Sequence, residues 1–215
     1  MKDAPARLLA EFLGVFFLCI FGIGAITNGA ELTGVALAHG LAIFVAIAAF
    51  AHVSGAHFNP AVTVALAATR RIGAVDAVAY IVAQLVGGLA AALVANYAYG
   101  SFKGVPALGQ GVSVSTGLVV EAIATFILMI TIMGVAVDSR GAFSIVAGLP
   151  IGLAIFGDIM WSGPVTGAAM NPARWFGPAI VNGDLSNALV WIVGPIVGAL
   201  AAAFVYDVVI KPARD

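Results

Sequence analysis

The sequence predicts an all-α integral membrane protein of one domain, with six membrane-spanning helices and two shorter re-entrant helices. Charged residues make up 9% of the 215 residues, whereas hydrophobic residues make up 62%. Soluble domains contain about 25% charged residues, so this chain has too few charges to cover a water-facing surface. Apolar segments of about 20 residues, the length that crosses a bilayer core of about 30 Å, recur along it. The net charge of −1, without a basic run, excludes nucleic acid as a partner.

The predicted spans follow one another with brief connections, apart from a longer loop at 98–116. They cover residues 8–26, 33–53, 75–97, 118–137, 143–161 and 188–209. Two further apolar segments, 59–68 and 171–181, are too short to cross a bilayer alone. The 26 glycines favour close helix packing, because small residues let helix backbones approach within lipid. The apolar segment after the N-terminus is not expected to be a cleavable signal, since many spans follow it.

The basic residues predict the orientation, because Lys and Arg concentrate in cytoplasmic loops. With these spans, only Lys103 lies in a loop on one side. The basic residues on the other side are Lys2, Arg7, Arg70, Arg71, Arg140, Lys211 and Arg214. We therefore expect both termini in the cytoplasm, with the plasma (inner) membrane as the expected location and an intracellular membrane as the alternative.

The two halves of the chain resemble each other. The segment Gly40-Leu-Ala-Ile-Phe44 recurs 112 residues later, and Asn59-Pro60-Ala61 recurs at the same offset as Asn171-Pro172-Ala173. Each half (1–107 and 108–215) contains an odd number of spans, so the second enters the membrane the opposite way up. The sequence therefore predicts two inverted repeats, whose functional site lies near the midplane where they meet.

Each Asn-Pro-Ala predicts the start of a half-helix. Asn is a strong N-cap, and Pro suits the first helical position because its missing N–H costs nothing there. Inverted symmetry brings the half-helices in from opposite faces, so that their positive N-termini approach each other. The Asn oxygens cap the helices, which leaves their amide NH₂ groups to donate to a passing molecule.

Together these segments resemble the aquaporins of the major intrinsic protein family. The matching motifs are His57-Phe-Asn-Pro-Ala-Val-Thr63 and Met170-Asn-Pro-Ala-Arg174, and the likeness covers nearly the whole chain. The resemblance implies an aquaporin-like bundle and a passive channel that conducts water, and in some branches small neutral solutes, while excluding protons and ions. It also implies a homotetramer in membrane lipid, with one pore per subunit and no cofactor, and it implies that Asn59 and Asn171 donate to permeating molecules.

By the same resemblance, an outer selectivity filter consists of His39, Ile159, Ala168 and Arg174, a combination similar to that of plant tonoplast intrinsic proteins. Because Ala168 is small, we expect a filter wide enough for ammonia, urea, hydrogen peroxide or glycerol beside water. Trp175 and Trp191 make a glycerol channel less favoured, since glycerol channels of the family typically have Asp where this chain has Trp175.

Carbonyl groups and apolar side chains are expected to form opposite walls of the pore. The carbonyls would come from Gly55, Ala56, His57, Gly167, Ala168 and Ala169. The apolar wall would contain His39, Ile43, Ile155 and Ile159. The resemblance assigns Glu11 and Glu121 a structural role as acceptors for the loops before the half-helices, and Asp158 is expected to face away from the pore.

Two other function classes remain open at this point. A proton- or ion-coupled secondary transporter would use Glu11 and Glu121 as carriers, whereas a membrane-junction protein would need a closed pore. The sequence contains no arrangement typical of an enzyme and no His, Cys, Asp and Glu set at metal-ligand spacing.

Overall fold

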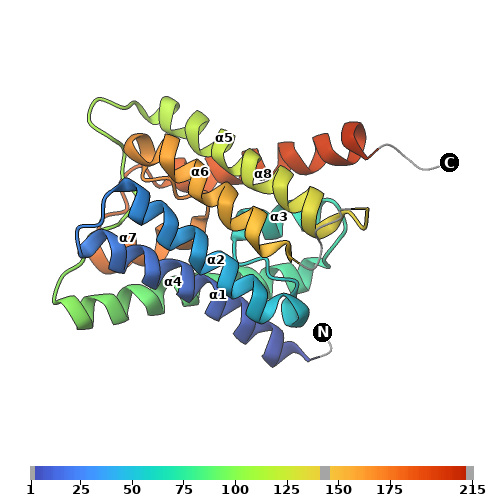
Figure 1. Cartoon of the computed structure of the whole chain (residues 1–215), viewed down its shortest axis with the longest axis horizontal. Helices are drawn as coiled ribbons and strands as arrows, with labels where there is room; N and C mark the ends of the chain where they lie inside the picture. Colours follow the sequence, from blue (N-terminus) through green and yellow to red (C-terminus); the bar gives the residue numbers. More distant parts are fainter. Residues whose placement is uncertain (1–2, 141–145, 212–215) are drawn as a thin grey trace.

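The computed structural model describes residues 3–140 and 146–211, and within these ranges the regular secondary structure is all helix, joined by turns and loops, with no strand. Six helices are long and apolar enough to cross a membrane in the described part of the chain. The elements run α1 (Ala4–Thr27), α2 (Leu32–Ser54), α3 (Pro60–Ala68), α4 (Ala74–Tyr99), α5 (Val114–Ile132), η1 (Met133–Val137), α6 (Gly148–Thr166), α7 (Pro172–Asn182), α8 (Ala188–Val205) and η3 (Tyr206–Ile210). Figure 1 shows the long helices side by side, with α3 and α7 between them.

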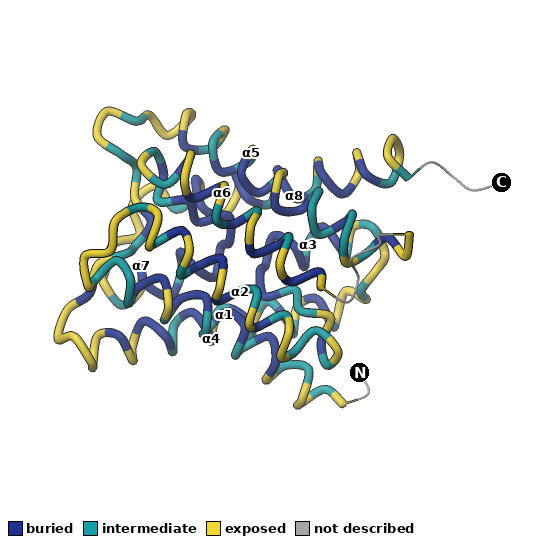
Figure 2. Tube along the Cα trace, viewed as in Figure 1, coloured by how far each residue is buried: buried dark blue, intermediate teal, exposed yellow. Residues whose placement is uncertain are grey.

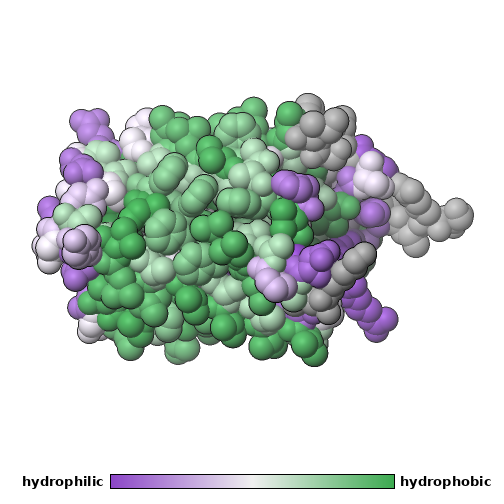
Figure 3. Space-filling model, turned by 90° about the horizontal axis from the view of Figure 1, so that it is seen from below, coloured by the Kyte–Doolittle hydropathy of each residue, from purple (hydrophilic) through white to green (hydrophobic). Residues whose placement is uncertain are grey.

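The outside of the bundle is apolar along the middle and polar at both ends. Large hydrophobic side chains such as Val78, Leu93 and Val197 are more than half exposed. In Figure 3 these surfaces form a wide hydrophobic band between two hydrophilic ends. Figure 2 shows that buried residues gather on the inward sides of the helices. This distribution is that of a protein whose solvent around the middle is lipid.

Close backbone contacts hold the helices together. Gly40 of α2 lies against the carbonyl of Gly152 in α6, and Gly152 lies against the carbonyl of Gly40. A methyl group at either position would overlap the facing backbone, so this crossing needs two glycines. The same principle places Gly87 of α4 against the Phe12 carbonyl of α1. Such contacts give van der Waals packing where lipid supplies no hydrophobic drive between helices.

Each half-helix starts as its sequence predicts. Asn59 has an extended backbone, and its side chain accepts from the Ala61 N–H at 2.9 Å. Asn171 accepts from the N–H of Ala173 at 2.9 Å and of Arg174 at 3.3 Å. Pro follows each Asn at the first helical position. These caps satisfy amides that the first turn cannot pair.

The main difference from the predicted spans concerns the fifth one. It was expected at 143–161, but α6 covers Gly148–Thr166. The expected end at Trp161 is wrong because the helix continues through Pro164, which membrane helices tolerate where neighbouring groups compensate the lost hydrogen bond. The expected start, Phe143, lies outside the described residues. The fourth and sixth spans end in π-helical turns, η1 and η3, that the sequence pattern does not distinguish from α-helix.

Candidate functional site

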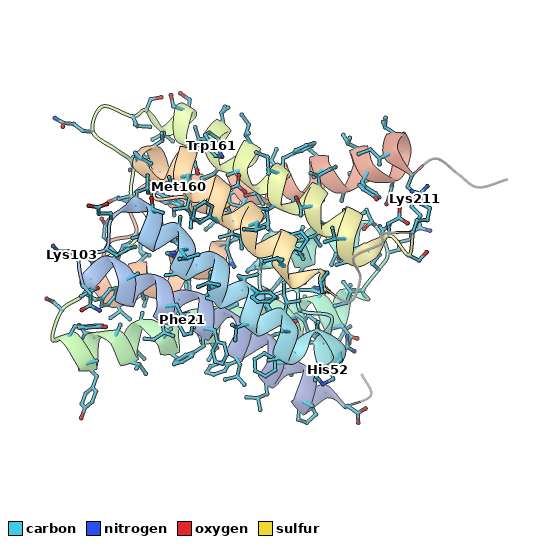
Figure 4. All side chains as sticks on the ribbon, in the orientation of Figure 1. Phe21, His52, Lys103, Met160, Trp161 and Lys211 are labelled. Carbon is cyan, nitrogen blue, oxygen red and sulfur yellow. The ribbon has the colours of Figure 1, made fainter. Side chains whose placement is uncertain are left out.

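A cavity of about 920 Å³ enters the bundle from one end and reaches its centre. Arg71 and His52 lie at its outer end, and His39 and Arg174 lie at its inner end. Figure 4 places His52 at the same end of the molecule as Lys211, opposite Lys103. The cavity therefore connects one polar surface of the protein with the region where α3 and α7 meet.

Two asparagines join the half-helices at the inner part of this cavity. The Asn59 Nδ2 donates to the Met170 carbonyl at 2.8 Å, and the Asn171 Nδ2 donates to the Phe58 carbonyl at 2.8 Å. Both residues also line the cavity. The expectation that their NH₂ groups are wholly available therefore needs correction, because one N–H of each is used to hold the opposite loop. One N–H of each amide remains for a molecule in the cavity.

The loops before the half-helices have an unusual backbone. Ala56 and Phe58 have φ values of 52° and 49°, and Ala168 and Met170 have φ values of 46° and 53°. This left-handed region costs a residue with a side chain about 1–2 kcal/mol. The strained conformation prevents the loops from forming helix, so that their backbone groups are left to bond elsewhere.

Two buried glutamates bond these strained loops. Glu121 accepts from the N–H groups of Ala169 at 2.9 Å and Met170 at 2.7 Å, and from the Thr166 hydroxyl at 2.6 Å. Glu11 accepts from the N–H groups of His57 at 3.0 Å and Phe58 at 2.7 Å. Every one of these contacts is a donor facing a carboxylate oxygen, which is the partner that a buried carboxylate needs.

Further polar side chains complete the Glu11 cluster. The Ser54 hydroxyl donates to Glu11 at 2.6 Å, and the Gln84 amide donates to both Glu11 at 2.7 Å and Thr63 at 3.0 Å. No pattern in the sequence predicts the roles of Gln84 and Thr63 in this cluster. Ser54 had a detectable signal, because Ser54-Gly55 and Thr166-Gly167 lie at the repeat offset and both hydroxyls bond the glutamate of their own half.

Arg174 lies on the first turn of α7 with an exposed fraction of 5%. Among the described residues, its Nε and Nη1 have no hydrogen-bond partner. A buried guanidinium with unpaired N–H groups is costly, and a polar molecule in the cavity can supply the missing acceptor.

Of the other three predicted filter residues, only His39 lines the cavity, beside Arg174. Ile159 and Ala168 are buried, with exposed fractions of 2% and 0%, and neither lines this cavity. Of the predicted carbonyl wall, Gly55, Ala56, His57 and Ala169 line the cavity, whereas Gly167 and Ala168 do not. Ile43 and Ile155 line it, as expected of an apolar wall.

Comparisons with known proteins agree with this geometry. A model of the major intrinsic protein family matches residues 2–206. The chain belongs to the major intrinsic protein family. Among its relatives, aquaporin NIP1-1 of Zea mays is 41% identical over 97% of this chain and 77% of its own length. Aquaporin TIP4-4 of Zea mays is 40% identical over 93% of this chain and 84% of its own length. An aquaglyceroporin structure from Plasmodium falciparum is 27% identical and superposes with a TM-score of 0.90, covering 98% of both chains.

These findings establish a passive membrane channel for water and small solutes, with the aquaporin-like bundle predicted from the sequence. The two glutamates fit this function better than a carrier role, since each is already engaged by several fixed donors. A proton carrier instead needs a carboxyl group that exchanges its proton with the pathway.

The structure shows what Trp175, the residue after Arg174, contacts. Its ring stacks on Trp191 with 5.7 Å between centroids and an interplanar angle of 10°. The Trp191 indole also donates to the Thr166 carbonyl at 3.0 Å. Both rings are buried with Ala169 and Ala179, so Trp175 fills space between α7 and α8. Asp158, next to Ile159, instead accepts from the Trp161 indole at 3.1 Å and does not line the cavity, as expected.

Two ion pairs lie at or next to residues that line the outer part of the cavity, Arg71 and Val137. Arg71 donates twice to Asp207, at 2.7 Å and 2.8 Å, and so ties the loop after α3 to η3. Asp138 accepts from Arg140 and from the Tyr206 hydroxyl at 3.0 Å. The hydrogen bonds from Arg140 hold the pKa of Asp138 well below its ordinary value of 3.8. At neutral pH these carboxylates are therefore paired, and the positive charge at the mouth is partly balanced.

Proposed function

We propose that this channel passes urea, ammonia, hydrogen peroxide and glycerol beside water, and that His39, Ile159, Ala168 and Arg174 form its selectivity filter. The observation that carries this proposal is the buried Arg174 guanidinium, whose Nε and Nη1 lack partners among the described residues, beside His39 at the inner end of the cavity. Such a group donates to any small neutral solute that has an acceptor oxygen or nitrogen. A cation gains nothing from it and is repelled.

The rest of the proposed path follows from the contacts of the half-helices. The free N–H of Asn59 and of Asn171 would donate to the permeating molecule, next to the paired Pro60-Ala61 and Pro172-Ala173 segments. Carbonyl groups of the strained loops would accept from it. The N-termini of α3 and α7, which the Asn–carbonyl bonds bring together, oppose a cation at this point through their dipoles. Proton passage is therefore disfavoured.

The assembly and orientation are also part of the proposal. We infer two inverted repeats in a single domain, a homotetramer in the membrane and no enzymatic activity. The arrangement of basic residues supports cytoplasmic termini, since α1 begins and η3 ends at the same end of the bundle, opposite Lys103 (Figures 1 and 4). The plasma membrane is our proposed location, and a reporter fused to either terminus tests the orientation.

Stopped-flow light scattering on vesicles with purified protein tests the solute range. Vesicles that shrink fast under an impermeant osmolyte and then re-swell fast under urea would support the proposal. Fast shrinkage with re-swelling no faster than that of empty vesicles would contradict it and leave a strict water channel. His39→Phe should lower urea passage more than water passage, because the larger ring narrows the filter, and equal losses of both would contradict a filter role for His39.

A further inference from the structure

The ring of His39 rests against a gap in helix α1. This gap exists because residue 22 is glycine: a Cβ at this position would lie 2.8 Å from the His39 Cδ2 and still closer to its Nε2 and Cε1. Contacts below 3 Å essentially do not occur for a real Cβ, so a methyl group at residue 22 and the present ring position exclude each other. The position of His39 thus depends on the absence of a side chain on a neighbouring helix.

A hydrogen bond fixes the ring in this place. The His39 Nδ1 lies 2.8 Å from the Val35 carbonyl, one turn earlier in α2. A carbonyl can only accept, so Nδ1 carries the proton in this contact. The ring is 2% exposed and lies close to Cys19 and Arg174. The His39 ring is therefore held between its own helix α2, helix α1 and the guanidinium of Arg174.

We propose that Gly22 is a specificity-determining positioning residue of this channel. It allows the His39 ring to lie against α1 beside Arg174 instead of across the path of the solute. The inference rests on the proposed filter and deepens it, since it identifies a residue outside the filter that sets its width. A side chain at residue 22 narrows the channel without contacting the solute itself.

The direction of the displacement follows from what surrounds the ring. Helix α1 has little room to retreat, because Gly87 of α4 packs against the Phe12 carbonyl and Gly104 packs against the Cα of Ile23, the residue next to Gly22. The ring is the end of a side chain, and its remaining open side is the cavity that it lines. With a methyl group at residue 22, the ring therefore turns into the cavity and loses its bond to Val35.

The test compares Gly22→Ala with Gly24→Ala in the same helix. A Cβ at Gly24 meets only the Tyr99 hydroxyl, at an ordinary 3.5 Å, so Gly24→Ala controls for an added methyl group in α1. One methylene of steric difference is worth roughly tenfold or more in discrimination. We expect Gly22→Ala to lower the ratio of urea to water permeability on the order of tenfold, and Gly24→Ala to leave it unchanged.

A double variant separates a positioning role from damage to the fold. Gly22→Ala combined with His39→Ala removes the ring that the methyl group displaces, so it should restore urea passage to the level of His39→Ala alone. The inference is overturned by a Gly22→Ala ratio equal to that of Gly24→Ala, or by a double variant that stays as restricted as Gly22→Ala.

Measuring water permeability in the same variants lets the role of Gly22 be tested independently of the proposed solute range. If the unmodified channel passes no urea, the proposed solute range fails. The positioning inference is then decided by water alone: Gly22→Ala must lower water permeability, and the double variant must restore it. A water permeability that is the same in all variants would overturn the inference.

Discussion

The substitution Glu121→Gln tests how the second loop of the channel is held in its strained conformation. Glu121 accepts from Thr166 and the Ala169 N–H with one oxygen and from the Met170 N–H with the other. A glutamine offers only one acceptor oxygen. In its better orientation the oxygen keeps Thr166 and Ala169, and the new NH₂ group faces the Met170 N–H at a distance that is now 2.7 Å from the carboxylate oxygen.

The cost can be worked from this one lost acceptor. A buried donor without a partner costs about 1–3 kcal/mol of unfolding free energy. For chains of this size each kcal/mol changes the unfolding temperature by about 2–4 °C. Glu121→Gln should therefore lower the unfolding temperature of the detergent-solubilised protein by about 2–12 °C. Water permeability should fall too, because the Met170 carbonyl positions the Asn59 amide at 2.8 Å.

Glu31→Gln is the matched control for this experiment. Glu31 is exposed at the start of α2, and its side chain makes no capping hydrogen bond. The same loss of one negative charge should therefore leave both the unfolding temperature and the water permeability unchanged. If Glu121→Gln unfolds within 1 °C of Glu31→Gln, by intrinsic tryptophan fluorescence, then Glu121 does not act as a carboxylate acceptor and the reasoning is refuted.

Three further predictions concern other charged groups. Arg174→Ala should raise proton or cation leak roughly 30-fold, since a unit charge about 8 Å away contributes about 2 kcal/mol at an effective dielectric constant of 20. The leak is measured in vesicles loaded with a pH dye, with Arg174→Lys as control, and an unchanged leak counts against the filter assignment. Asp158→Asn should raise the unfolding temperature, because it removes a buried negative charge whose Oδ2 has no partner in the described part of the chain, while the amide oxygen can keep the Trp161 indole. A lower unfolding temperature would show that the charge is needed. Arg140 lowers the pKa of Asp138, so the Asp138 carboxylate stabilises the fold above about pH 4, and this stability is lost as the pH falls further. The unfolding temperature should therefore fall less between pH 5 and pH 3 in Asp138→Asn than in the unmodified protein. An equal fall in both proteins would exclude this contribution.

Much of the fold could be predicted because its signals are local. A span needs only an apolar segment of sufficient length, and the starts of α3 and α7 need only Asn followed by Pro. The predicted end of α6 at Trp161 is wrong because the helix continues through Pro164 to Thr166, whose hydroxyl bonds Glu121 and whose carbonyl accepts from Trp191. Tertiary contacts decided that helix end.

The site was harder to predict because its geometry depends on pairs of residues far apart in the sequence. The Asn caps could be predicted from three consecutive residues. The hydrogen bond from the Asn59 amide to the Met170 carbonyl, in the loop of the other half, could not. The place of His39 is a clearer case: its own helix supplies the hydrogen bond to Val35, yet the space for its ring comes from Gly22, which in the sequence is one of 26 glycines. A glycine that makes room for a side chain on another helix has the same local pattern as one that lets two backbones touch. In the proposed filter, the width is therefore set by the packing between α1 and α2 as much as by the residues that face the solute.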